Sequence, residues 1–149
     1  MTTRIAVLAL ALAATATTAL AQMKPDVVIA YRRSAMTMIG WNFGPMSAMV
    51  KGKIAFDAKE FAKHAARIEF LAPQVLEGFA KGSDQGAETD AKADIWTHFD
   101  DFKSKLGDLV EQSRALSDVA KTGDEAKMKD QFKKLGGACK ACHDKYKQD

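Results

Sequence analysis

Three residues near the end of the chain have types and spacing that can do chemistry: Cys139, Cys142 and His143, which read C-x-x-C-H. Two thiols three residues apart on a helix lie on one face, where both can add to the vinyl groups of one porphyrin. The imidazole that follows is then placed to ligate the iron. A C-x-x-C pair can also form a redox disulfide or half a zinc site. The adjoining histidine, and the absence of any other cysteine, argue against both and predict a covalent haem c.

The first 21 residues have the pattern of a secretory signal peptide, which predicts export to the periplasm and a mature chain from Gln22. A charge at Arg4 precedes an apolar run, residues 5–14, and Ala19-Leu20-Ala21 forms an A-x-A cleavage site. In an oxidising compartment a cysteine pair forms a disulfide or is consumed by haem attachment, and the histidine favours haem. Residues 22–149 are long enough for one domain with one core.

The composition of the mature chain predicts neither a nucleic-acid partner nor a membrane anchor. The formal charge of +3 falls to +2 when Arg4 leaves with the signal peptide. Lysine and glutamate residues are interspersed along the chain rather than gathered into one basic patch. No stretch after the signal peptide approaches the roughly 18 apolar residues that a transmembrane helix requires.

Apolar residues recur at steps of three and four in four segments, and this periodicity predicts an all-α protein. The segments are residues 25–50, 57–79, 95–120 and 124–146. Their connections are short, apart from a glycine-rich loop at residues 78–86, so we expect an antiparallel four-helix bundle. Cys139 and Cys142 fall on the apolar stripe of the last segment. The haem is therefore expected inside the bundle, near the C-terminus of the last helix.

Local signals predict where the helices begin and where they are interrupted. Asp57, and either Thr122 or Asp124, are candidate N-caps, because their side chains can accept hydrogen bonds from the first backbone N–H groups. Gly44-Pro45 predicts a kink or break in the first helix, and Pro73 predicts that the second helix bends or splits. The third segment carries no such signal and is expected to form one long helix.

The group on the far side of the iron is left open by these patterns. His64 and His98 are expected at the surface or at a helix interface rather than at the iron. Met36 follows Arg32 by four residues and so shares its helix face. If this helix crosses the haem, Met36 approaches the distal side and Arg32 can reach a propionate. The thioether of Met36 then either ligates the iron or covers it as an apolar side chain.

Short motifs spread along the chain carry a family resemblance. They are Lys24-Pro25, Tyr31-Arg32-Arg33-Ser34-Ala35-Met36, Asn42-Phe43-Gly44, Val50-Lys51-Gly52-Lys53, Phe56-Asp57-Ala58, Ile95-Trp96 and Gly137-Ala138-Cys139-Lys140-Ala141-Cys142-His143-Asp144-Lys145. Through them, essentially all of residues 22–149 is similar to the cytochrome c′ family, the class II c-type cytochromes. The C-terminal position of the haem motif is specific, because class I cytochromes c carry it near the N-terminus.

The resemblance implies a four-helix bundle, usually a homodimer, that holds a five-coordinate, high-spin haem c and is not an enzyme. His143 is then the only protein ligand, Arg32 binds a propionate and Arg33 contacts the haem beside it. Met36 takes the position of the bulky residue that crowds the sixth iron site. Members of the family bind nitric oxide, and sometimes carbon monoxide. The Met- and Phe-rich faces near the first segment are the expected dimer contact.

Thr89 and Asp90 match a loop that commonly touches the haem in this family, and two other positions depart from its pattern. Many members carry arginine four positions after the haem histidine, where this chain has Lys147; a lysine lacks the planar donor fork, which puts any proximal role in doubt. Met36 can ligate, and related low-spin cytochromes of the c556 type use such a methionine. The leading expectation is a haem protein that binds a diatomic gas, exchanges electrons with an unidentified redox partner, or does both. The alternative is a low-spin, one-electron carrier.

Overall fold

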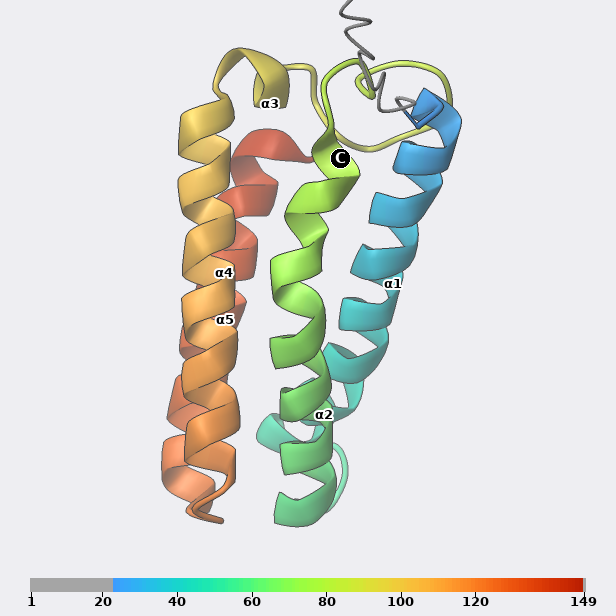
Figure 1. Ribbon diagram of the computed structural model, residues 1–149. Coiled ribbons are helices and arrows are strands. Elements are labelled where there is room, and N and C mark those ends of the chain that lie inside the picture. Colours follow the sequence, from blue (N-terminus) through green and yellow to red (C-terminus); the bar gives the residue numbers. More distant parts are fainter. Residues whose placement is uncertain (1–22, 149) are drawn as a thin grey trace, which may run out of the picture.

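Residues 23–148, which the computed structural model describes, form a bundle of four long helices (Figure 1). A 3-10 helix extends the second long helix, and a single helical turn precedes the third. The elements are α1 (Pro25–Val50), α2 (Ala58–Leu71), η1 (Ala72–Phe79), α3 (Asp94–Thr97), α4 (Phe99–Ala120) and α5 (Glu125–Tyr146). Successive long helices run in opposite directions, which confirms the predicted all-α antiparallel four-helix bundle. The predicted signal peptide, residues 1–21, lies outside the described residues.

The helix starts follow the predicted capping residues. Asp57 accepts hydrogen bonds from the backbone N–H groups of Lys59 (2.9 Å) and Glu60 (3.0 Å) at the start of α2. Asp124 accepts one from the N–H of Lys127 at 3.1 Å and begins α5. In each case the side chain supplies an acceptor for N–H groups that have no partner inside the helix. The prediction for Asp57 is confirmed, and of the two candidates for the last helix Asp124, rather than Thr122, is the N-cap.

The two helix prolines act differently. α2 gives way to η1 at Ala72, one residue before Pro73, so the predicted splitting of this helix is confirmed. α1 continues through Pro45 to Val50, so the break, one of the two predicted outcomes, does not occur. A proline inside a helix costs about 3 kcal/mol. Met46 and Met49 are buried in the core just after it, at about 1.5–3 kcal/mol each, and this burial offsets the cost.

The third segment is divided, which corrects the expectation of one long helix. His98 leaves the helical conformation (φ −124°, ψ 43°), so that α3 ends at Thr97 and α4 begins at Phe99. The hydroxyl of Thr97 donates to the carbonyl oxygen of Asp94 at 3.1 Å. Such side-chain bonds compete with the helical ladder and favour an end to the helix. The apolar spacing of Ile95 and Phe99 continues across the division, which is why the sequence pattern does not reveal it.

The core runs along the axis of the bundle and consists of the apolar stripes of all four long helices, with further side chains from η1 and α3. Its largest fully buried side chains include Ile29, Met46, Phe61, Ile68, Ile95, Phe102, Leu116, Met128 and Leu135. Aromatic rings interlock where α1, α2 and α5 meet: the ring of Phe132 lies 4.4 Å from that of Phe43 and 5.9 Å from that of Phe61, between centroids. No helix within residues 23–148 is both long enough and apolar enough to cross a membrane.

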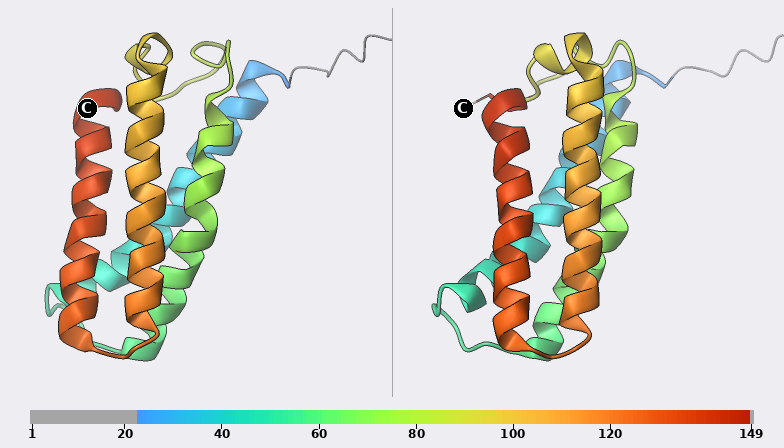
Figure 2. Two further views of the ribbon diagram at one scale, coloured as in Figure 1. Left: turned by 60° about the vertical axis from the view of Figure 1, so that its left-hand side comes forward. Right: turned by 90° about the vertical axis from the view of Figure 1, so that its left-hand side faces the viewer.

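α1 crosses the bundle obliquely, and this crossing decides where a cavity forms. At one end α1 and α5 meet through the stacked rings of Phe43 and Phe132. At the other end the two helices lie well apart in both views of Figure 2. Residues 80–93, which we call the strap, pass from η1 to α3 at that end. The strap begins later than the predicted glycine-rich loop, because residues 78 and 79 still belong to η1.

The strap is fastened to the end of α5. The backbone N–H of Lys92 donates to the carbonyl oxygen of Tyr146 at 2.9 Å, and that of Gln148 donates to the carbonyl oxygen of Asp90 at 2.7 Å. Ala91 and Lys147 form an isolated antiparallel bridge between the same two segments. The strap therefore connects the helix that carries the cysteines to the region of η1 and α1.

Candidate haem-binding site

A cavity of about 830 Å³ lies between the diverging ends of α1 and α5 and is also bounded by η1, the strap, α3 and α4. Its volume falls in the range of about 300–1,000 Å³ that is typical of ligand pockets. All eight site residues predicted from the sequence line it: Arg32, Arg33, Met36, Thr89, Asp90, Cys139, Cys142 and His143. Apolar side chains fill much of the remaining wall, among them Ile39, Phe43, Phe79, Ile95, Phe102, Leu106 and Leu109. Residues as far apart in the chain as Arg32 and Lys147 are thus gathered around one space.

The two thiols on α5 are unlike those of a redox dithiol. Cys142 is buried and Cys139 is partly buried. Burial raises the pKa of Cys142 to about 11, although the charge of Lys105 opposes this shift, and burial also raises the pKa of Cys139. Reactive cysteines in redox C-x-x-C motifs have pKa values below the ordinary range. The pair is therefore a set of protonated thiols in a cavity wall.

The imidazole of His143 lines the cavity next to these thiols. Partial burial in the wall, followed by the positive charge of Lys147, lowers the pKa of His143, and Asp144 opposes the shift. A lowered pKa favours the unprotonated ring, which is the form that ligates a metal. Within residues 23–148 no group of three or more His, Cys, Asp or Glu side chains is arranged to hold a metal ion. The zinc alternative therefore lacks the additional ligands that a zinc site needs.

Met36 lies on the α1 wall of the cavity, where it is partly buried and packs against the core. The two other histidines lie elsewhere, as predicted. His64 Nδ1 is 2.9 Å from Asn42 Oδ1 between α1 and α2, and His98 is exposed beside Thr97. Neither ring lines the cavity. The thioether of Met36 is thus a polarisable group on the α1 side of the cavity, on the same wall as Ile39 and Phe43.

Arg32 is a buried cation, 3% exposed, whose contacts come from η1 and the strap. Its Nη1 donates to the carbonyl oxygens of Gly78 (3.1 Å) and Ser83 (2.9 Å) and to Ser83 Oγ (3.1 Å). Its Nη2 donates to Thr89 Oγ1 at 2.9 Å, while the buried Nε has no partner within the described residues. Burial lowers the pKa of Arg32, Asp84 opposes the shift, and an arginine keeps its charge. A buried cation with an unused donor fits an anionic ligand group such as a haem propionate.

The neighbouring site residues are held less firmly. Arg33 is exposed, and its Nη1 donates to the carbonyl oxygen of Glu88 at 3.3 Å. Asp90 is exposed and pairs with Lys147, with 3.6 Å between the carboxylate oxygen and Nζ. Lys147, four residues after His143 on the cavity wall, is therefore paired with the strap.

Sequence reasoning missed the residues that hold Arg32 in place. Gly78 and Ser83 contact Arg32 from 46 and 51 positions away in the chain, a relationship that no local pattern carries. Serine is a common residue in exposed turns, so nothing in the sequence indicated that Ser83 is buried. Lys105 also lines the cavity, and its spacing on α4 gave no sign of this.

Comparisons with known proteins agree with a haem site in this cavity. The family model described as Cytochrome C′ matches residues 27–147. Cytochrome c′ of Rubrivivax gelatinosus is 40% identical over 125 residues, which cover 84% of this chain and 97% of that protein. The structure of cytochrome c prime from Shewanella frigidimarina is 41% identical, with a TM-score of 0.82, and the match covers 86% of this chain and 99% of that chain.

A third relative is a nitric oxide complex of a cytochrome c prime variant from Alcaligenes xylosoxidans. It is 32% identical, with a TM-score of 0.78, and the match covers 86% of this chain and 98% of that chain. These matches span nearly the whole length of each relative and the whole bundle of this chain. The chain therefore belongs to the cytochrome c′ family, which implies a non-enzymatic protein with covalent haem c.

Proposed function

We propose that this protein is a periplasmic haem protein that binds a diatomic gas, chiefly nitric oxide, at a five-coordinate iron. After residues 1–21 are removed, one haem c is attached through Cys139 and Cys142, and His143 is the iron ligand from α5. When bound, the haem supplies an iron that takes a gas ligand or exchanges one electron. One observation carries the proposal: the motif and all the other candidate contacts line a single cavity of about 830 Å³.

Polar residues at the cavity hold the anionic edge of the cofactor. Arg32 contributes its charge and its unused Nε–H. The hydroxyl of Thr89 accepts from Arg32 Nη2 (2.9 Å) and from the N–H of Ala91 (3.2 Å), so its own proton is left to donate. Arg33 lines the same space, and Asp90 holds the strap beside it through Lys147. Together these groups favour one orientation of the carboxylates.

The α1 wall selects among gases by its shape and its lack of a distal histidine. Met36, Ile39 and Phe43 present mainly apolar surface to the cavity, and neither His64 nor His98 reaches it. A ligand that depends on a hydrogen bond from a distal imidazole is not assisted here. Nitric oxide does not depend on such a bond, and a relative has been solved as its nitric oxide complex. Carbon monoxide is expected to bind more weakly.

The alternative is a low-spin one-electron carrier, and the thioether of Met36 on the cavity wall is the observation that favours it. The absorption spectrum of the purified ferric protein separates the two. High-spin bands support gas binding, and a low-spin spectrum with a thioether-to-iron charge-transfer band contradicts it. Met36→Ala should leave a five-coordinate spectrum nearly unchanged and should convert a low-spin one. Met38→Ala, on the outer face of the same helix, is the matched control and should alter neither.

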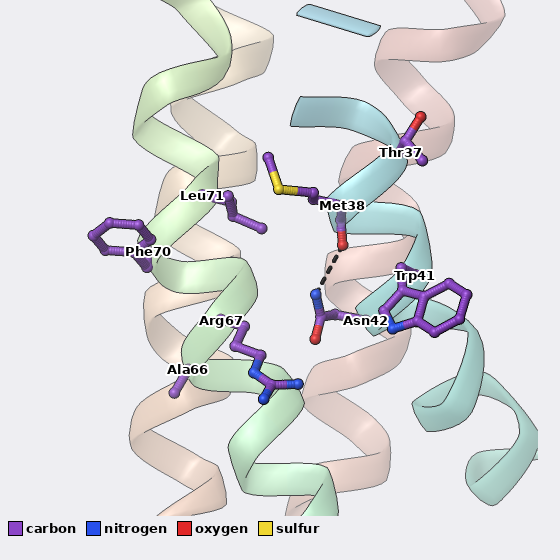
Figure 3. Close-up of a pocket in the computed structure, with 8 residues that line it drawn as sticks. All are labelled: Thr37, Met38, Trp41, Asn42, Ala66, Arg67, Phe70 and Leu71. Atoms are coloured by element: carbon purple, nitrogen blue, oxygen red, sulfur yellow. Dashed lines mark hydrogen bonds between the residues drawn. The ribbon is translucent and has the colours of Figure 1, made fainter. Parts of the chain in front are cut away.

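We further propose that the protein is a homodimer through the outer face of α1 and α2. A shallow hollow of about 620 Å³ lies there, lined by Thr37, Met38, Trp41, Asn42, Ala66, Arg67, Phe70 and Leu71 (Figure 3). Figure 3 shows Met38 and Leu71 in the gap between the helices, while Trp41 and Phe70 point outward. Trp41 and Phe70 are 77% and 73% exposed. Large apolar side chains gathered in one exposed patch favour association with another protein surface.

A further inference from the structure

Hydrogen-bond acceptors from the end of η1 and from the strap surround the guanidinium of Arg32. Both N–H groups of Nη1 are taken by acceptors of Gly78 and Ser83, and Nη2 is bound by Thr89. Every one of these acceptors lies in residues 78–89, at the end of η1 or in the strap. Two aromatic rings also pack against the guanidinium: its central carbon lies 5.1 Å and 5.4 Å from the ring centroids of Phe79 and Trp96, which are neighbours 6.2 Å apart.

This arrangement leaves a defined edge of the arginine unused. Nε and Nη2 lie along the edge of the guanidinium that a carboxylate binds side-on. Nε is buried without a partner, and Nη2 has only Thr89 as an acceptor. Nη1, on the other side, is saturated by three acceptors. The contacts of Nη1 therefore determine which edge of Arg32 remains for the cavity.

Ser83 is itself fixed and cannot rotate freely away from Arg32. It is 1% exposed, and its Oγ donates to the carbonyl oxygen of Ala80 at 2.8 Å while accepting from Arg32. The same carbonyl accepts from the indole Nε1 of Trp96 at 3.2 Å. Ser83, Ala80 and Trp96 thus form one connected polar unit around the guanidinium. Such a network is rigid only while all of its members are satisfied.

Gly78 is needed for a spatial reason. A Cβ atom at this position would lie 2.4 Å from the Cβ and 2.9 Å from the Cα of Arg32, closer than any side chain can approach. The absence of a side chain lets η1 contact α1 directly at Arg32, which places the carbonyl oxygen of Gly78 within reach of Nη1. Any larger residue must push the two helices apart at this point.

We propose that Ser83 and Gly78 are positioning residues that orient Arg32 so that its free edge meets an anionic group of the cofactor. The inference rests on the proposed haem site, and it adds a role for two residues that do not line the cavity themselves. A strap that only stabilised the fold would need neither a saturated Nη1 nor an unused Nε. A carboxylate on that edge completes the set of acceptors around the buried charge.

The test is a double-mutant cycle on the covalently loaded protein, read out as the reduction potential of the haem. Arg32→Gln removes a positive charge near the propionates, so the ferric form is favoured and the potential falls. Ser83→Ala should lower the potential in the same direction by a smaller amount, because the arginine loses its orientation. In the Arg32→Gln background, Ser83→Ala should produce no further shift, since Ser83 acts only through Arg32.

Ser113→Ala is the matched control, because Ser113 is also 1% exposed and its Oγ donates to a local carbonyl oxygen, that of Val110, at 2.9 Å. It should lower thermal stability without moving the potential. The inference is overturned if Ser83→Ala leaves the potential at the wild-type value, or if its shift persists in full without Arg32. Gly78→Ala should repeat the Ser83→Ala shift if it folds. A wild-type protein without covalent haem would instead refute the proposed function itself.

Discussion

The two sides of α1 differ in which groups are unusual: a buried polar group on one side and exposed apolar groups on the other. On the side of the cavity, Arg32 carries a buried charge with an unused donor. On the side of α2, the buried Asn42 is satisfied: its Nδ2 donates to the carbonyl oxygen of Met38 at 2.8 Å, and its Oδ1 lies 2.9 Å from His64 Nδ1. There the unusual groups are apolar and exposed, chiefly Trp41.

The difference separates two kinds of recognition on one helix. An unused buried donor is costly unless a ligand supplies the acceptor, so it indicates a small polar or anionic group inside a cavity. A patch of large apolar side chains without unused polar groups favours a broad, flat partner instead. Changes on the cavity side should therefore alter haem and stability, and changes to the exposed apolar side chains on the outer side should alter association.

The largest expected effect is loss of the cofactor from the cavity side. A chain with both Cys139→Ser and Cys142→Ser has no thiol left, so it should carry no covalently bound haem. Acid extraction followed by mass measurement of the intact chain checks this. Trp41→Ser, on the outer side, should retain one haem per chain. Covalent haem in the double variant, or its loss in Trp41→Ser, would contradict the division.

Arg32→Leu should be the next largest change, and it concerns stability. It leaves the acceptors at Gly78, Ser83 and Thr89 without their charged donor in a buried place. We expect the free energy of unfolding in urea to fall by about 3 kcal/mol. Arg33→Leu, one residue on and exposed with a single bond of 3.3 Å, should change it by about 0.5 kcal/mol or less. Equal losses in the two variants would show that the strap does not depend on Arg32.

Local spacing in the sequence predicted where the helices lie. It did not predict features that depend on contacts between segments far apart in the chain. The stripe that includes Phe132, Cys139 and Cys142 predicted α5 and the inward direction of the thiols, because helical periodicity is a local property. The haem motif and the family resemblance likewise identified all eight candidate residues that line the cavity. The oblique path of α1, which opens the cavity, depends on packing between helices, and no single segment encodes it.

The errors have the same origin. Gly44-Pro45 predicted a kink or a break; the break does not occur, because burial of the residues after Pro45 keeps the helix continuous. His98 interrupts the third segment although the apolar spacing continues through it. Ser83 and Gly78 became recognisable only when the strap was seen to close on Arg32 across about 50 residues of chain.

For the exposed apolar side chains of the outer side, we predict a change in association alone. Trp41→Ser combined with Phe70→Ser should raise the dimer dissociation constant at least about tenfold, or about 1.4 kcal/mol, while haem content stays the same. Sedimentation equilibrium over a range of concentrations measures this. Ile54→Ser, 49% exposed in the connection between α1 and α2, is the matched apolar control and should leave the constant unchanged. A wild-type protein that remains monomeric would contradict the proposed interface.

The smallest effect concerns the histidine that satisfies Asn42 on this outer side. Partial burial, then the charge of Arg67, lowers the pKa of His64; Lys63 adds to the shift and Glu60 opposes it. Unfolded chains take up this proton near the ordinary pKa of about 6.5, and the folded protein takes it up only at lower pH. The unfolded state therefore binds more protons in this window, so stability falls as the pH drops through about 6.5 toward the folded pKa.

His64→Gln removes the titrating group and keeps an amide that can hydrogen-bond to Asn42. The free energy of unfolding should then depend less on pH between about pH 7 and about pH 5 than in the wild type. His98→Gln, at the exposed position between α3 and α4, is the control and should keep the wild-type dependence. If both variants follow the wild-type curve, the contact between His64 and Asn42 does not contribute to the pH dependence of the free energy of unfolding. If His64→Gln alone flattens it, the polar pair beneath the apolar patch contributes to stability only while the imidazole is neutral.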